Sequence, residues 1–192
     1  MRRRDYLVGA RRRARVLMLR FPFPGWANMP VVDLETLPDS ARVWIFGSDI
    51  PLSDDGTKAL LDGVDRHLAD WRAHGAPLTV ARQWRDGRFL VIAVDQNAEG
   101  ASGCSIDGLF RVLTQLESSV GASLVGGGRA FFRDGHGAVQ SASRDDVSTL
   151  AGSGAITRDT VVFDTSLTDL GTFRACFERR AKESWLNHLL PH

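Results

Sequence analysis

The chain has 192 residues, a length that suits one domain or one domain with an appendage. Hydrophobic residues make up 43% of the chain and charged residues 24%, the ordinary composition of a soluble globular protein. No apolar run approaches the roughly 20 residues of a membrane-spanning helix, and two cysteines cannot supply a disulfide framework. The composition argues against a membrane span and a disulfide-stapled scaffold, and we expect a soluble cytoplasmic protein.

The net charge of +1 is unevenly distributed along the chain. Residues 1–28 contain eight arginines and one acidic residue, Asp5, so this segment carries a net charge of +7. Such a basic arm could bind nucleic acid or an anionic lipid surface through its charge. Runs of like charge, however, more often form disordered, solvated tails. We interpret residues 1–28 as a disordered arm, and we expect nucleic acid as a partner only through this arm.

The chain after the arm begins with a predicted strand and a predicted helix. Residues 42–46 form a short apolar run that predicts a buried strand. Ser53 is a good helix N-cap, and apolar residues recur at helical spacing from Leu60 to Trp71. Gly75 then predicts the end of this helix.

A β-hairpin and a second helix follow. The strand-like runs 78–84 and 89–95 flank an Asp-Gly turn, which is a strong hairpin signal. The second run is continuously apolar, as expected of a central strand. Apolar residues then recur at helical spacing over residues 106–120, and residues 130–133 predict one more strand.

The order strand, helix, strand, strand, helix, strand predicts an α+β protein with a split βαβ, or ferredoxin-like, sheet domain. We assign this domain to residues 29–141. Residues 142–192 then predict a small C-terminal α/β extension, packed on the same domain. Within it we expect a short helix after Ser143, a strand around residues 161–163 and a final helix that starts near Leu170 and extends its apolar stripe to Leu189.

Several polar residues follow the predicted strands or begin the second helix. We expect strands 43–46 and 89–94 to run parallel, so that their carboxyl ends share one edge of the sheet, where open α/β sheets commonly bind ligands. The residues expected to converge there as a ligand-binding site are Ser48, Asp49, Asp95, Cys104, Ser105 and Asp107. The alternative is that Asp95, Ser105 and Asp107 only fill turn and cap positions, which suit these residue types.

Cys104 is the candidate for nucleophilic chemistry. It lies at the start of the second predicted helix, where free backbone N–H groups favour a thiolate; the alternative is a small buried hydrophobe. His74 ends the first predicted helix, so we expect it at the opposite edge from Cys104. No Cys/His spacing resembles a metal site, and no P-loop is present. We therefore expect neither a metal nor a cofactor.

Five segments together resemble a known family. They are residues 41–46, 71–75, 88–95, 102–107 and 183–185. These segments resemble an uncharacterised family of small bacterial proteins, common in Bacteroidota and often labelled "ABC transporter ATPase". The resemblance covers roughly residues 30–190, and its most specific part is Gly-Cys-Ser-Ile-Asp. The family's recurring polar positions match His74, Asp95, Cys104, Ser105, Asp107 and Trp185. The label implies nucleotide hydrolysis, but this sequence lacks a P-loop, so the resemblance carries over no activity.

Two classes of function follow from these observations. The first is a binding or regulatory module with a pocket around Cys104, whose partner is an unknown small ligand or protein. The second is a thiol-dependent enzyme or redox protein that uses Cys104 as its nucleophile. A base beside the thiol would distinguish the two classes. Because none is expected there, the sequence favours the binding module.

Overall fold

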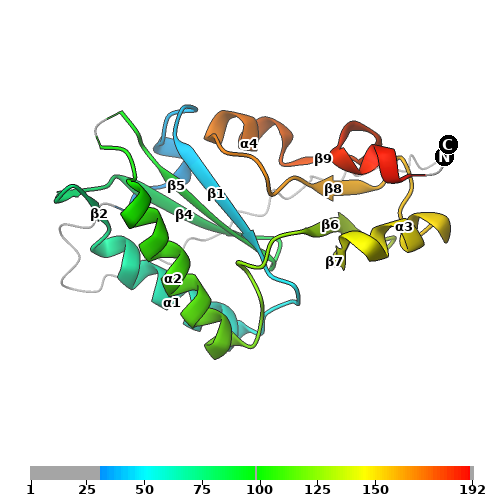
Figure 1. Ribbon diagram of the computed structural model, residues 1–192, viewed down its shortest axis with the longest axis horizontal. Coiled ribbons are helices and arrows are strands. Elements are labelled where there is room, and N and C mark those ends of the chain that lie inside the picture. The colour runs from blue at the N-terminus through cyan, green and yellow to red at the C-terminus, as the bar shows by residue number, and fades with distance from the viewer. Residues whose placement is uncertain (1–30, 98, 191–192) are drawn as a thin grey trace, which may run out of the picture.

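The structure is a computed structural model that describes residues 31–97 and 99–190 (Figure 1). It is a mixed α+β fold built around two antiparallel sheets. The central sheet has the strand order β1-β5-β4, and the C-terminal sheet has the order β7-β6-β8-β9.

The strands of the central sheet are β1 (Arg42–Gly47), β4 (Val80–Arg85) and β5 (Phe89–Val94). Those of the C-terminal sheet are β6 (Arg129–Arg133), β7 (Val139–Ser143), β8 (Val161–Phe163) and β9 (Glu178–Arg180). The helices are α1 (Asp54–Ala69), α2 (Gly103–Val120), α3 (Arg144–Gly152) and α4 (Leu170–Cys176).

Helices α1 and α2 cover one face of the central sheet (Figure 1). Alternate strand residues, such as Phe46, Leu90 and Ile92, face these helices in one apolar core. Gly63 lets the helices approach closely, because a Cβ atom there would overlap the side chain of Leu116. All six residues of β5 are buried, which confirms the predicted central strand.

The predicted N-cap of the first helix is confirmed. The Ser53 hydroxyl accepts the N–H of Gly56 at 3.1 Å and so caps α1. Ser102 caps α2 in the same way by accepting the N–H of Ser105 at 3.3 Å. Helix α2 ends at Gly121, whose φ of +69° is a conformation that favours glycine.

The first helix is shorter than predicted. It ends at Ala69, and the next residues form the small hairpin of β2 (Arg72–Ala73) and β3 (Ala76–Pro77). His74 and Gly75 form its turn, with φ values of +51° and +86°. Left-handed residues cannot continue a right-handed helix, so the prediction of a helix reaching Gly75 is wrong.

A cluster of phenylalanines joins the other face of the central sheet to the C-terminal sheet. The Phe89 ring centroid lies 5.1 Å from those of Phe131 and Phe177, and 4.8 Å from that of Phe163. The ring of Phe131 also lies against Gly47, where a Cβ atom would overlap it. The two sheets therefore share one apolar core.

Ion pairs reinforce this junction at the protein surface. Arg133 bonds to Asp86 in the β4–β5 turn at 2.8 Å and to Glu178 of β9 at 3.1 Å. The hydrogen bond to Asp86 is the main reason why the pKa of Arg133 is raised. Arg85 of β4 adds a further contact to Glu178 at 3.4 Å.

The far face of the C-terminal sheet has its own core. Ala130, Phe132 and Val162 pack there against Val147 of α3 and Leu186. The predicted final helix is interrupted, because the residues after Cys176 form the edge strand β9 and pair with β8.

The ferredoxin-like arrangement is not confirmed. Its expected fourth strand, residues 130–133, lies in β6 and pairs with β7 and β8 of the C-terminal sheet instead of joining the central sheet. Strands 43–46 and 89–94 were expected to be parallel, but β1 and β5 are antiparallel. The expected boundary between residues 29–141 and 142–192 falls inside β7. The expected arm, residues 1–28, lies outside the described residues.

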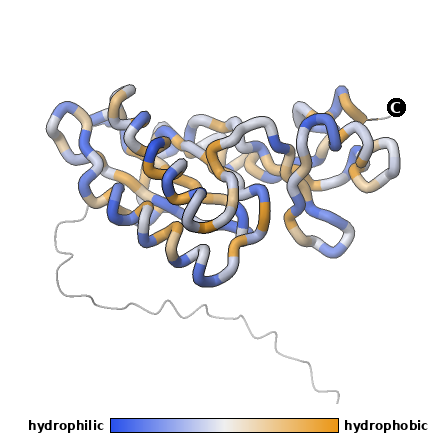
Figure 2. The backbone as a smooth tube through the Cα atoms, turned by 60° about the horizontal axis from the view of Figure 1, so that its bottom comes forward, coloured by the Kyte–Doolittle hydropathy of each residue, from blue (hydrophilic) through white to orange (hydrophobic). Residues whose placement is uncertain are grey.

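Hydrophobic and hydrophilic stretches alternate along the elements of the described chain (Figure 2). In residues 31–97 and 99–190, no helix has the length and apolar character needed to cross a membrane.

Gly47 provides a test of the junction between the sheets. We expect Gly47→Ala to lower the free energy of unfolding by about 1–3 kcal/mol, since the added methyl group overpacks the contact with Phe131. Gly152→Ala in α3, where a Cβ atom meets nothing within 4 Å, should be neutral or stabilising. Urea denaturation measures both variants. Equal stabilities of Gly47→Ala and the wild type would contradict the assigned contact.

Candidate functional site: a groove along strand β1

The structure separates the six predicted site residues into two groups. Because β1 and β5 are antiparallel, the end of one strand lies beside the start of the other. Ser48 and Asp49 follow β1 at one end of the central sheet, and Asp95 follows β5 at the other. A six-residue strand separates these ends by about 17 Å. The expected convergence at one edge is therefore wrong, since it assumed parallel strands.

Four of the predicted residues lie at the end of the sheet where α2 begins: Asp95, Cys104, Ser105 and Asp107. The N–H and the hydroxyl of Ser105 both bond to Ser102, which is an N-cap contact. Asp95 accepts a backbone N–H two residues ahead at 2.9 Å, which is a turn contact. Cys104 and Asp107 are exposed, and their side chains form no hydrogen bond with the described part of the chain. Cap and turn roles therefore account for Asp95 and Ser105.

His74 lies at the same end of the sheet as the start of α2. The buried Trp71 donates its indole N–H to the carbonyl oxygen of Ser105 at 2.9 Å, so the segment after α1 contacts α2. The expectation that His74 lies at the opposite edge from Cys104 is wrong, because the antiparallel strands bring the end of α1 and the start of α2 together. His74 is exposed. No three His, Cys, Asp or Glu side chains of the described residues could hold a metal ion together.

Ser48 and Asp49 belong to a buried polar junction at the other end of the sheet. Arg88, only 3% exposed, donates from Nε to the Ser48 carbonyl at 3.0 Å and from Nη2 to the Asp49 carbonyl at 3.1 Å. Burial lowers the pKa of Arg88, and the Asp49 carboxylate opposes this effect. Asp49 Oδ1 also accepts the N–H of Ser123 at 2.7 Å. The junction thus ties β1 to the β4–β5 turn and to the loop after α2.

Arg88→Lys tests this structural role. A lysine keeps the positive charge but cannot reproduce the forked pair of hydrogen bonds. We expect a loss of about 1.5–3 kcal/mol in the free energy of unfolding, as for a hydrogen bond to a charged group. Arg66→Lys, at an exposed position of α1, is the matched control and should leave stability unchanged. Equal effects of the two substitutions in urea denaturation would refute the role of Arg88.

His67 lies where α1 packs beside Trp71, with ring centroids 5.8 Å apart. Its Nε2 is buried and has no hydrogen-bond partner among the described residues. Burial lowers the pKa of this imidazole. The folded state therefore favours the neutral imidazole ring, so the protonation of His67 affects the stability of the fold.

His67 predicts a pH-dependent stability. The unfolded chain protonates this residue near the ordinary value of about 6.5, before the folded chain does. Its contribution is therefore complete above that pH and is lost as the pH falls below it, by no more than about 1.4 kcal/mol per pH unit for one proton. Urea denaturation at pH 7.5 and 5.5 measures the loss, which His67→Gln should reduce and the exposed control His188→Gln should not. An unchanged pH dependence in His67→Gln would contradict the prediction.

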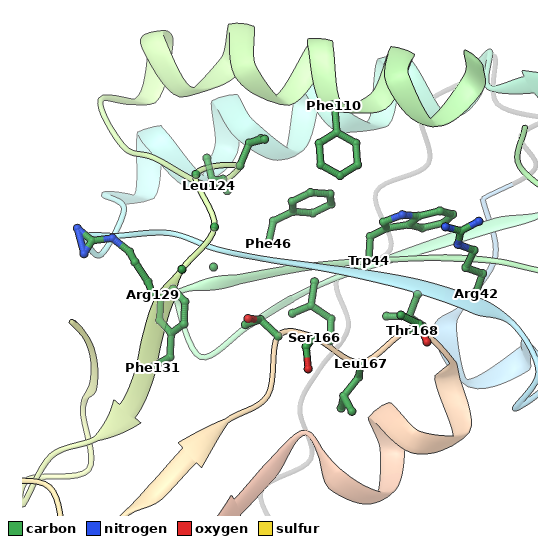
Figure 3. A pocket seen from close by; sticks show the side chains of 18 residues that line it. Arg42, Trp44, Phe46, Phe110, Leu124, Arg129, Phe131, Ser166, Leu167 and Thr168 are labelled. Carbon is green, nitrogen blue, oxygen red and sulfur yellow. The ribbon is translucent and has the colours of Figure 1, made fainter. Parts of the chain in front are cut away.

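A cavity of about 270 Å³ lies along the outer edge of β1, the edge that does not pair with β5 (Figure 3). Only the start of this edge is paired. The Val43 N–H donates to the Thr168 carbonyl at 2.9 Å, and the Ala41 carbonyl accepts the N–H of Leu170 at 2.9 Å. Beyond Val43 no backbone hydrogen bond joins this edge to residues 165–167, and a groove opens between the two segments.

Aromatic side chains form the wall of the groove on the helix side. Trp44 and Phe46 project from β1, and Phe110 points from α2 toward Phe46 (Figure 3). The rings of Phe46 and Phe110 meet edge to face, with centroids 5.3 Å apart. Leu124 continues this apolar wall.

Loops with small and polar residues form the other walls. Residues 126–128 are all glycine, and Thr165, Ser166 and Thr168 add hydroxyl groups. The Glu117 carboxylate fixes the start of the glycine loop, because its Oε1 accepts the N–H groups of residues 124 and 125 at 2.5 and 2.6 Å. The groove is therefore framed by an anchored loop.

An arginine lies at each end of the groove (Figure 3). The Arg42 guanidinium lies 4.7 Å from the centroid of the Trp44 ring. Arg129 lies at the other end, with its Nη2 3.9 Å from Asp49 Oδ2. The lining residues include no aspartate, glutamate, histidine or cysteine. The groove is thus apolar in its middle and has an arginine at each end, and the arginine at one end, Arg129, also contacts Asp49.

Sequence reasoning missed this groove. In the sequence, Arg42, Trp44 and Phe46 indicate only a buried strand. The sequence offers a partial signal for the lining, because the aromatic residues Trp44 and Phe46 alternate along the strand and so lie on one face of the sheet. The glycine run at 126–128 gave a second signal.

Comparisons with protein-family models, with curated proteins and with solved structures gave no match to this chain.

Proposed function

We propose that this protein is a binding module whose ligand occupies the groove along the open edge of β1. The observation that carries the proposal is an unpaired strand edge beside a cavity with an aromatic wall and an arginine at each end. Ligand sites are typically concave and mostly apolar, with a few placed polar groups. The groove has these properties, whereas Cys104 lies on an exposed surface.

The lining defines the chemistry of the ligand. Trp44, Phe46 and Phe110 favour an apolar middle part, and Arg42 and Arg129 favour anionic ends. The volume of about 270 Å³ lies just below the usual range of about 300–1,000 Å³ for ligand pockets. A small or narrow anionic ligand suits this site.

The groove supports binding better than catalysis. Its lining has serine and threonine hydroxyls but no imidazole, carboxylate or thiol that could act as a general base. The alternative, a thiol-dependent enzyme, would use Cys104, which lies outside the groove lining. No hydrogen bond between described residues joins Cys104 to a base.

The open edge of β1 also agrees with a ferredoxin-like arrangement of the central sheet. We propose that β1, α1, β4, β5 and α2 form the split βαβ part of a ferredoxin-like arrangement. The order β1-β5-β4, with β5 antiparallel to both neighbours, supports this proposal. In that arrangement the fourth strand pairs with the first, so the groove lies where a fourth strand would lie.

We also propose a reducing location, in agreement with the expected cytoplasm. The support is that Cys104 and Cys176 are both free thiols. We also propose that the protein belongs to the bacterial family that its sequence resembles. This relationship implies no activity for the protein.

The dye 1-anilinonaphthalene-8-sulfonate, which joins aromatic rings to an anionic group, is a suitable probe of the groove. We expect it to bind the native protein with a rise in fluorescence, and Phe110→Ala and Arg129→Gln each to weaken binding at least fivefold. Cys104→Ser is the matched control and should bind the dye like the wild type. Near-ultraviolet circular dichroism verifies that each variant keeps native packing.

The same variants would also show whether the dye binds outside the groove. Loss of dye binding in Cys104→Ser, with no effect of Arg129→Gln, would return the ligand to the surface at Cys104. Absence of binding to the wild-type protein would refute the proposed function.

A further inference from the structure

We propose that the occupant of the groove is an extended acidic segment of a partner protein, which pairs with β1 as an added strand. This inference rests on the proposed function and names the partner of that site. It goes further because it assigns the recognition to backbone hydrogen bonds of the sheet edge. Addition of a strand to an open edge is a recurring mode of peptide recognition.

The backbone of β1 presents the required groups. The outward contacts of Ala41 and Val43 show that odd-numbered residues direct their N–H and C=O groups away from β5. The Val43 carbonyl, both groups of Ile45 and the Gly47 N–H then point into the groove. None of these groups forms a backbone hydrogen bond with another residue of the described chain. An extended peptide could pair with all of them.

The surroundings favour a single extended segment over a whole sheet. The glycine loop at 126–128 and the segment 165–168 lie on either side of the open edge. A folded sheet would collide with these walls, whereas one narrow strand can lie between them. A Cβ atom at Gly127 or Gly128 would meet nothing within 4 Å, so the loop leaves open space beside it.

The arginines at the two ends of the groove favour an acidic occupant. Arg42 and Arg129 lie at the two ends of the groove, and the guanidinium of Arg129 is directed toward Asp49. The chain's own residues 1–28 carry a net charge of +7, so charge repulsion opposes this segment as the occupant. A second copy of β1 would bring a second Arg42 to the same groove. A partner strand with acidic residues at its ends would instead pair with both arginines.

A labelled heptapeptide tests the proposal with the full chain. The probe is acetylated and amidated, has a glutamate at each end and alternates valine with threonine between them. Fluorescence anisotropy measures its binding, and we expect it to displace the anilinonaphthalene dye. We expect at least tenfold weaker binding for a peptide with lysine in place of both glutamates, and for the double variant Arg42→Gln and Arg129→Gln. Arg66→Gln, which removes an exposed charge on α1, should bind the peptide unchanged.

Backbone methylation separates strand addition from simple charge attraction. In an added strand, alternate N–H groups face β1 and the others face away. Methylation of the three valine nitrogens and methylation of the two threonine nitrogens should therefore differ at least tenfold in their effects on binding. The inference would be overturned if the two methylated peptides bound with equal affinity. It would also be overturned if the lysine peptide bound as tightly as the glutamate peptide.

The outcomes distinguish this inference from the proposed function. If the dye binds in the groove and the peptide does not, the strand inference fails and the binding site stands. If neither binds, both fail. Sedimentation of the protein, without and with the peptide, tests whether a second copy occupies the groove. A dimer that dissociates when the peptide is added would show that the edge of β1 serves self-association. This result would overturn the proposal of an acidic partner.

Discussion

The packing of Phe131 against Gly47 is the contact on which the arrangement of the two sheets depends. Gly47 ends β1, and its missing side chain lets the Phe131 ring reach Phe89, with ring centroids 5.1 Å apart. This contact directs β6 into the C-terminal sheet and away from the outer edge of β1. The same path holds Arg129, two residues before Phe131, at the end of the groove. An open strand edge is thus a consequence of how the core is packed.

Local signals in the sequence predicted most individual elements. The Asp86-Gly87 turn, the Ser53 cap and the apolar run 89–94 all act within a few residues, and the structure confirms each of them. The direction of pairing between β1 and β5 has no such signal, because apolar periodicity is the same in parallel and antiparallel strands. The membership of β6 in the C-terminal sheet depends on the distant Gly47 and could not be predicted locally.

In the candidate site, too, local roles could be predicted from the sequence, whereas features that depend on distant contacts could not. Ser48 and Asp49 were correctly placed at the end of a strand, but Arg88 engages their carbonyl groups in a structural junction. Asp95 and Ser105 hold a turn and a helix cap, which was the alternative interpretation of these residues. The open edge of the groove depends on backbone groups that every residue possesses, so residue types alone cannot reveal that edge. Only the pairing of strands shows which backbone groups stay free.

The pairing of Val43 with Thr168, and of Ala41 with Leu170, also affects how the chain is completed during synthesis. The strand that borders the groove is made first, and the segment that secures its start, residues 168–170, is made well after it. At ~5–20 residues per second, roughly 6–25 s separate the two on the ribosome. During that interval the whole outer edge of β1 is unpaired, and the apolar residues that α4 later covers are exposed. The nascent chain therefore passes through a stage that is prone to association and that ends only after residues 168–170 have been made.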